Sequence, residues 1–164
     1  MKEKQCTKCG LTKSFNDFFG QKISKDKKRS ECKECNRKVK AKYLSTEKGF
    51  MKAVYYQMGA RKDDTNTRGR FCKVELTVEE FFQLWENHKK KYGMICPYTG
   101  DVLEFKRNSK GIRGSQVSVD RIDNTKEYSK ENIVFCSSRA NHMKGPITIE
   151  MMKKVLEIYD EKRK

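Results

Sequence analysis

Apolar residues recur at helical spacing in three stretches of this chain, and each stretch predicts an amphipathic helix. The stretches cover about 47–60, 78–91 and the segment that follows Thr148. Their apolar positions are Phe50, Val54 and Met58 in the first, Val78, Phe81, Phe82, Trp85 and His88 in the second, and Ile149, Met152, Val155, Leu156 and Tyr159 in the third. We expect the aromatic stripe of the second helix to pack in a core, with His88 packed or solvated rather than catalytic.

The ends of the second helix carry recognisable signals. Thr77 and Glu80 have the spacing of a capping box, in which each side chain satisfies an otherwise unpaired backbone amide. Tyr92 and Gly93 end the pattern, because glycine readily adopts the left-handed conformation that closes a helix.

Short apolar runs predict strands at 102–105, 116–120 and 133–136. A further helix begins at Ser137 or Ser138 and stops at about Lys144, before a Gly-Pro pair. Strands and helices in this arrangement predict an α+β fold, in which 118–144 forms strand, turn, strand and helix. We expect a linker at 61–70, which is polar and aperiodic, and a basic loop at 106–114.

The composition changes this picture in two ways. Hydrophobic residues make up 35% and charged residues 37% of the chain. Its core is therefore expected to be thin and to need a stabilising cross-link, such as a structural metal ion. The formal net charge of +16 favours a polyanionic partner, bound with a strong dependence on salt. Nucleic acid is the better candidate, because the sequence has neither an apolar run of membrane-spanning length nor a lipidation motif.

Four cysteines could supply this cross-link by binding a metal ion. They form two CxxC pairs, Cys6 with Cys9 and Cys32 with Cys35, separated by a 22-residue interval. Two such pairs supply four thiolates to one tetrahedral ion, and zinc prefers sulfur ligands in closed structural sites. The alternative of two disulfides needs an oxidising compartment, whereas the chain begins without a signal-peptide pattern and has an odd number of cysteines, seven. We therefore expect structural Zn²⁺ and a reducing, cytoplasmic location.

Basic side chains follow the second CxxC pair and recur in the 106–114 loop. The helix predicted at 36–44 would leave the zinc site with its lysines exposed to solvent. The residues expected to contact nucleic acid are Arg37, Lys38, Lys40 and Lys42 in the helix, and Lys106, Arg107, Lys110 and Arg113 in the loop. A merely solvated loop is the competing interpretation of the second group.

Two oxygen-bearing side chains are predicted to meet in the second half of the chain. Asp120 stands at a strand end and could face Asn141 on the following helix. Hard oxygen ligands with water completing the shell suit magnesium or manganese rather than zinc. A cation so held on a phosphodiester would neutralise the charge that develops on its oxygens.

These residues resemble a known family. SVDRID, YSKENIVFC and ANHMKG, in this order and spacing, look like the HNH, or ββα-metal, nuclease motif. The double CxxC followed by a basic helix looks like phage-type HNH endonucleases and a rare-cutting HNH restriction enzyme. The resemblance covers about 1–42 and 94–146. It implies that Asp120 and Asn141 are the ligands of the catalytic metal and that Asn132 ties the site loop together.

The resemblance also places Arg121 where the family normally has a histidine general base. Arginine cannot accept a proton, since its pKa exceeds about 12, but it can clamp a phosphate. Tyr98 stands where a tyrosine appears in the restriction-enzyme variant and is the favoured base. A phenol has an ordinary pKa near 10, which a nearby cation and arginine would have to lower. His142 is the alternative, although on a helix it would point about 100° away from Asn141.

A second departure concerns zinc in the nuclease core. Many relatives hold this core with four further cysteines, of which only Cys96 keeps its place here, since Ser137 and Ala140 stand where the later pair is expected. We therefore expect no second zinc. Cys72, Cys96 and Cys136 are expected to be buried thiols.

The resulting expectation is three parts: a zinc ribbon with basic helices at 1–62, an HNH core at 63–147 and a C-terminal helix at 148–164. The function expected from the resemblance is metal-dependent cleavage of double-stranded DNA that leaves 5′-phosphate ends. The resemblance also implies a prokaryotic or phage-infected cell as the location. Cleavage of both strands would need a homodimer, whereas a monomer could nick. A non-catalytic zinc-dependent binding module is the alternative, and RNA is a third possible target.

Overall fold

The computed structural model describes residues 2–59, 72–106 and 114–163, which form two compact units, Met1–Thr46 and Glu47–Lys164. The predicted linker at 61–70 lies outside the described residues, as does the boundary expected at 62/63. The helix over 47–59, which the sequence grouped with the ribbon, belongs to the second unit. Helices and small antiparallel sheets occur together, so the α+β class is confirmed.

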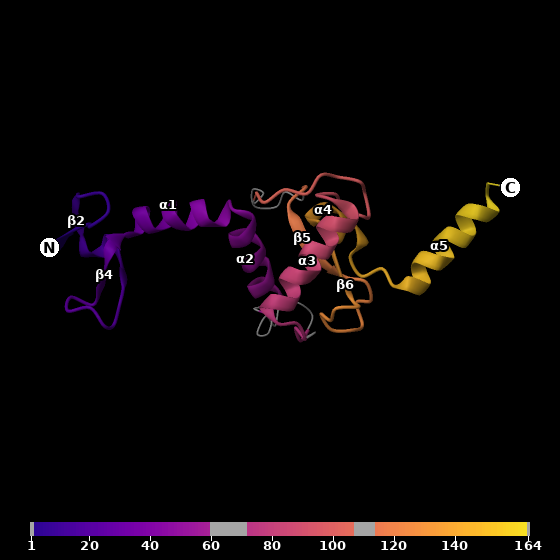
Figure 1. The fold of residues 1–164 in the computed structure, drawn as a ribbon, viewed down its shortest axis with the longest axis horizontal. Coiled ribbons are helices and arrows are strands. Elements are labelled where there is room, and N and C mark those ends of the chain that lie inside the picture. The colour runs from indigo at the N-terminus through magenta and orange to yellow at the C-terminus, as the bar shows by residue number, and fades with distance from the viewer. Residues whose placement is uncertain (1, 60–71, 107–113, 164) are drawn as a thin grey trace. The chain divides into compact units, whose positions relative to one another are not determined.

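The first unit is built from two small hairpins and a helix (Figure 1). One hairpin pairs its strands near the first CxxC, and the other ends at the second CxxC. Its elements are β1 (Glu3–Gln5), β2 (Thr12–Ser14), the short 3₁₀ helix η1 (Phe15–Asp17), β3 (Phe18–Gly20), β4 (Lys28–Cys32) and α1 (Lys33–Leu44).

The second unit contains one antiparallel hairpin and four helices among the described residues. Its elements are α2 (Glu47–Gly59), α3 (Val78–Tyr92), β5 (Val117–Arg121), β6 (Ile133–Ser137), α4 (Ser138–Lys144) and α5 (Ile149–Glu161). Strands β5 and β6 pair in a register that sets Asp120 opposite Val134, and α4 contacts both strands. The strand predicted at 102–105 is reduced to two isolated bridges, Ile95–Val102 and Glu104–Gln116, because no strand pairs along its length.

Helix α3 has the ends that its sequence predicts. The Glu80 amide donates to Thr77 Oγ1 at 3.1 Å, and the Thr77 amide donates to Glu80 Oε2 at 2.9 Å. Gly93 closes the helix with a φ of +66°, where a side chain would be strained. Both predicted signals are confirmed.

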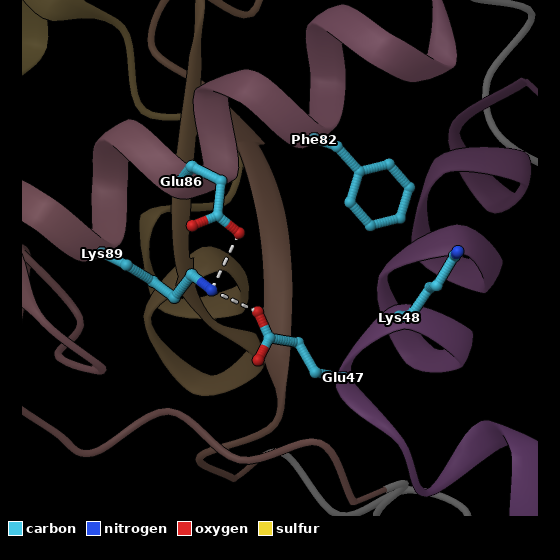
Figure 2. Close-up of a pocket in the computed structure, with 5 residues that line it drawn as sticks. All are labelled: Glu47, Lys48, Phe82, Glu86 and Lys89. Atoms are coloured by element: carbon cyan, nitrogen blue, oxygen red, sulfur yellow. Dashed lines mark hydrogen bonds and ion pairs between the residues drawn. The ribbon is translucent and has the colours of Figure 1, made fainter.

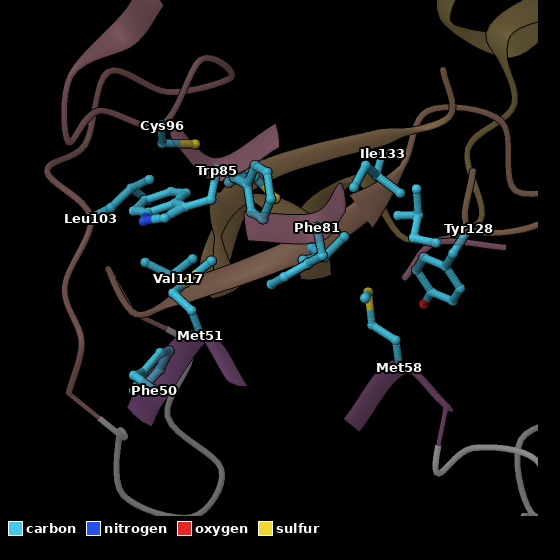
Figure 3. Packing of buried hydrophobic residues seen from close by; sticks show 14 of the residues in the cluster. Phe50, Met51, Met58, Phe81, Trp85, Cys96, Leu103, Val117, Tyr128 and Ile133 are labelled. Atoms are coloured by element: carbon cyan, nitrogen blue, oxygen red, sulfur yellow. The ribbon is translucent and has the colours of Figure 1, made fainter. Parts of the chain in front are cut away.

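The buried face of α3 forms the centre of the core (Figure 3). Trp85 packs edge-on against Phe135 of β6 at 5.1 Å between ring centroids, and Phe81 contacts the same ring at 5.3 Å. His88 is buried and stacks on Trp85 at 5.1 Å, so its predicted packing role is confirmed. In contrast, the apolar stripe of α5 remains exposed.

Helix α2 is tied to α3 at a surface pocket (Figure 2). Glu47 accepts hydrogen bonds from Trp85 Nε1 at 2.7 Å and from Lys89 Nζ at 2.6 Å, and Lys89 also pairs with Glu86. This charged cluster joins the first residue of α2 to α3. Across 2–59, 72–106 and 114–163, the helices all fall short of the length and apolar content that crossing a bilayer requires.

Candidate active site and metal centre

The first unit gathers the four cysteines of the CxxC pairs. The Sγ atoms of Cys6, Cys9, Cys32 and Cys35 all lie within 4.8 Å of one another, so they are positioned to hold a metal ion. No disulfide joins any of the seven cysteines, all of which lie in the described residues. The backbone amide of Cys32 donates to Cys6 Sγ at 3.2 Å and lowers the pKa of Cys6 to about 6, which favours the thiolate that a metal needs.

The cysteine cluster connects directly to the basic helix. Phe18 packs on the cluster and is 1% exposed, while Cys32 ends β4 and α1 begins at the next residue. The four predicted basic residues of this helix, Arg37, Lys38, Lys40 and Lys42, are exposed, as expected. In the loop of the second unit Lys106 is exposed, whereas Arg107, Lys110 and Arg113 lie outside the described residues.

In the second unit, Asp120 is the buried centre of a polar cluster whose member Tyr98 is partly exposed. It lies in β5 and is only 4% exposed. The Tyr98 hydroxyl donates to Asp120 Oδ2 at 2.9 Å. Lys144 Nζ lies 3.1 Å from Oδ1 and 3.0 Å from Oδ2 of the same carboxylate. Residues from the 96–99 turn, β5 and α4 therefore converge on one charged group.

Asn141 lies beside this cluster. Its Nδ2 donates to Ser118 Oγ and to the backbone carbonyl of Val119, each at 2.9 Å. The carboxamide of α4 is thus held on the residue that precedes Asp120, and the described residues place no hydrogen bond on its Oδ1. The structure brings the two predicted ligand residues to the same part of the hairpin.

The position of α4 has a local cause. Ser137 ends β6 and caps α4, because its Oγ accepts from the Ala140 amide at 3.1 Å. Cys96 Sγ accepts from the Ser137 amide at 3.3 Å, which ties the 96–99 turn to the start of the helix. Cys96 and Cys136 are buried as expected, whereas Cys72 is only half-buried. This junction positions Tyr98 in the turn and Asn141 in α4, whereas Asp120 is positioned by the pairing of β5 with β6.

Asn132 organises the loop that follows β5. Its Oδ1 accepts from the Asp123 amide at 2.8 Å, and its Nδ2 donates to the carbonyls of Asp123 at 3.0 Å and Glu127 at 2.8 Å. Buried at 5% exposure, it ties both ends of the loop together.

Arg121 and His142 do not join the Asp120 cluster. The Arg121 guanidinium donates to the Lys126 carbonyl at 2.8 Å and lies over the Tyr128 ring, 5.3 Å from its centroid. The side chain of His142 is exposed on α4. The structure thus brings together Tyr98, Asp120 and Asn141. The side chains of Arg121 and His142 lie outside this cluster.

The environment of Tyr98 stabilises its protonated form. Burial raises the pKa of Tyr98 well above its ordinary value, and the negative charge of Asp120 raises it further. A neighbouring positive charge is therefore required before this phenol can lose its proton near neutral pH.

Lys144 is the site residue that the sequence interpretation missed. Its side chain is 9% exposed, and its ammonium also donates to the Arg121 carbonyl at 2.6 Å. It stands three positions after Asn141 in α4 and so shares a face with it, which was the available signal. A buried carboxylate needs such a partner, because an isolated charge in a protein interior is costly.

Comparison with known proteins yields little. No protein-family model matches the chain, and no curated protein matches it. Among solved structures it is similar to the rare-cutting HNH restriction endonuclease PacI, described as perturbing DNA by an extraordinary mechanism. The two chains are 19% identical over 93% of this chain and 89% of the other, with a TM-score of 0.38. A TM-score this low does not establish a shared fold.

Proposed function

We propose that this protein is a metal-dependent DNA endonuclease of the HNH type, with Asp120 and Asn141 as its metal ligands. The observation that carries the proposal is the hydrogen bonding of Asn141, on α4, to β5 immediately before the buried Asp120. Two oxygen donors from separate elements at one place fit a small divalent cation.

Mg²⁺ or Mn²⁺ held by Asp120 and Asn141 would neutralise charge on the phosphodiester, and would also oppose the effect of Asp120 on the pKa of Tyr98. The donor set is suitable, because it contains oxygen atoms and no thiolate within hydrogen-bonding distance of the carboxylate among the described residues. Asp120 orients the cluster, and Asn132 holds the loop that follows it.

Tyr98 is the proposed acceptor of the proton from the attacking water, in its phenolate form. Its oxygen lies at Asp120, and a cation bound there would have to offset the raised pKa of Tyr98 before the phenol loses its own proton to solvent. His142 is the second candidate, from its exposed position next to Asn141. Arg121 cannot act as a base and is assigned to the scissile phosphate, as a bidentate donor.

The first unit would deliver the substrate. Its four cysteines are proposed to hold one structural Zn²⁺, since a closed set of four sulfurs is the ligand set that zinc prefers. The exposed basic face of α1 would contact the phosphates of double-stranded DNA, and two copies would be needed to cut both strands.

A non-catalytic DNA-binding module is the second candidate, and Lys144 is the observation that favours it. Its ammonium contacts both oxygens of Asp120 and so satisfies the carboxylate without a metal ion. Such a protein would bind DNA in a salt-sensitive manner and would not cut it.

Nicking of supercoiled plasmid by the zinc-loaded protein tests the proposal. Magnesium should be withheld rather than chelated, because a chelator would also strip the cysteine site. Cleavage is expected only with Mg²⁺ or Mn²⁺, and Asp120→Asn and Asn141→Ala should each reduce it by more than about a hundredfold.

Glu104→Gln, at an exposed acidic residue of the same unit, is the matched control and should cut like the parent. DNA binding without cleavage in any divalent ion would contradict the endonuclease and support the binding module. Tyr98→Phe and His142→Gln then identify the base. Only the variant that lacks the true base should lose activity across the whole pH range.

A further inference from the structure

The loop between β3 and β4 carries an unusually exposed isoleucine. Ile23 is 90% exposed, the largest value among the large hydrophobic residues that the structure describes. It lies between β3 and β4, which pair with each other. Single exposed apolar residues are common, so the surroundings of Ile23 decide whether it has a role.

The loop holds a defined shape. The Gln21 amide donates to the Lys27 carbonyl at 2.9 Å, and the Lys27 amide donates to the Ser24 carbonyl at 2.9 Å. Ser24 Oγ lies within hydrogen-bonding distance of the carbonyls of Gln21 at 2.9 Å and Lys28 at 2.8 Å, and its single proton is donated to one of them. Lys27 has a φ of +55°, a conformation that non-glycine residues keep only where neighbouring contacts enforce it. Ile23 is therefore presented to solvent by an ordered loop.

The base of the loop is anchored at the cysteine cluster. Phe18 of β3 pairs with Cys32 of β4 and is buried against the metal-ligating residues. Because its base is anchored, the loop is expected to keep its conformation when it contacts a partner. Ile23 therefore remains available for that contact.

Positive charge surrounds the isoleucine. The exposed basic residues of the loop and its flank are Lys22, Lys25, Lys27 and Arg29. The loop's carboxylate, Asp26, is paired with Lys4 at 2.5 Å and also accepts from the Lys28 amide. The tip therefore combines one apolar side chain with several cations and little accessible negative charge.

We propose that the 21–29 loop is a DNA-contacting finger, in which the basic side chains hold phosphates and Ile23 inserts between two stacked base pairs. Proteins that kink DNA use an apolar side chain of this size, flanked by cations, as a wedge. A lipid surface would call for a broader apolar face than a single residue supplies. The inference rests on the proposed function for its choice of DNA as partner.

Fluorescence of 2-aminopurine tests the wedge, because the base brightens when it is unstacked. The zinc-loaded full chain, without added magnesium, is titrated into a series of duplexes that each carry one 2-aminopurine at a flexible pyrimidine–purine step. We expect brightening in at least one duplex. Ile23→Ser should abolish it and weaken binding about tenfold, whereas Ile23→Leu should retain it.

Two further variants separate the wedge from general effects. Leu11→Ser alters another exposed apolar residue of the same unit and should leave both the signal and the affinity unchanged. The double substitution Lys22→Gln and Lys25→Gln should lower the slope of log affinity against log salt by roughly two, while Ile23→Ser leaves this slope unchanged.

The inference is overturned if Ile23→Ser brightens the probe like the parent, or if Leu11→Ser loses the signal equally. Tighter binding to anionic vesicles than to DNA would overturn it as well. Its failure is distinguishable from that of the proposed function, because unstacking without cleavage keeps the finger and contradicts the nuclease. Cleavage without unstacking supports the nuclease and contradicts the finger.

Discussion

The pairing of Asp120 with Lys144 is the most consequential contact at the scale of single residues. Both side chains are more than nine-tenths buried, and the ammonium lies about equally far from the two carboxylate oxygens. Removing one member of such a pair leaves the other charge buried and uncompensated, which costs far more than the pair itself contributes.

Replacing Lys144 by methionine should therefore destabilise the second unit by about 3–5 kcal/mol in the absence of a divalent ion. Adding Mn²⁺ should restore part of this loss, because a cation bound at Asp120 would replace the missing charge. Urea denaturation of the zinc-loaded protein, followed by Trp85 fluorescence with and without Mn²⁺, measures both effects.

Lys126→Met is the matched control, since Lys126 forms an exposed ion pair with Asp123 at 3.6 Å. Its loss should change stability by no more than about 0.5 kcal/mol. A Lys144→Met protein as stable as this control would show that the buried pair is unimportant. Failure of Mn²⁺ to stabilise the variant would count against the proposed metal ligands.

At the scale of elements, α3 connects the helix pattern of the sequence to the core. Its capping box and closing glycine fix both ends, while Phe81, Trp85 and His88 fill its buried face. His88 is the polar member of this face, and its Nε2 has no hydrogen-bond partner among the described residues. Burial lowers the pKa of His88 below its ordinary value near 6.5, although a backbone contact with Ile95 opposes the shift.

This shift predicts acid sensitivity of the helix and its core. Below a pH of about 6.5 the unfolded chain binds a proton at His88 more readily than the folded protein does. The contribution of His88 to the free energy of unfolding is thus fully present above that pH. It falls as pH decreases, by at most about 1.4 kcal/mol per pH unit. Urea denaturation between about pH 5.5 and 7.5 measures the slope.

His88→Phe should flatten the slope, because an aromatic ring keeps the packing against Trp85 and removes the titrating group. His142→Phe, at the exposed second histidine, should leave the slope as it is in the parent. An unchanged slope in His88→Phe would mean that another group causes the acid sensitivity.

At the scale of the whole molecule, the division into two compact units separates the four-cysteine cluster from the aromatic core. The buried apolar cluster of the first unit consists of one phenylalanine and three of the cysteines, whereas the second unit has an extended aromatic core. We expect that a cluster this small holds its hairpins only with a metal ion bound at the four cysteines.

Chelation of the cysteine-bound metal should therefore unfold the first unit and leave the second intact. The chain contains one tryptophan, Trp85, which is fully buried in the second unit and reports on that unit alone. We expect far-ultraviolet circular dichroism to weaken on chelation while Trp85 emission keeps its wavelength. Cys9→Ser should mimic chelation, and a red shift of Trp85 would contradict the independence of the two units.

The sequence alone determined the features whose signals are local. The caps of α3, the approach of the four cysteines and the order of hairpin and helix around Asp120 follow from spacing within a few residues, or from the shared chemistry of one ligand type. Tertiary structure alone decided which side chains surround Asp120 and which do not. Lys144 enters the cluster while Arg121 turns to Tyr128, and the predicted 102–105 strand is reduced to bridges. The contact of Lys144 with Asp120 depends on a partner distant in the chain, and it exists only once α4 is packed on the hairpin. The turn of Arg121 toward Tyr128 depends on how the loop after β5 folds back.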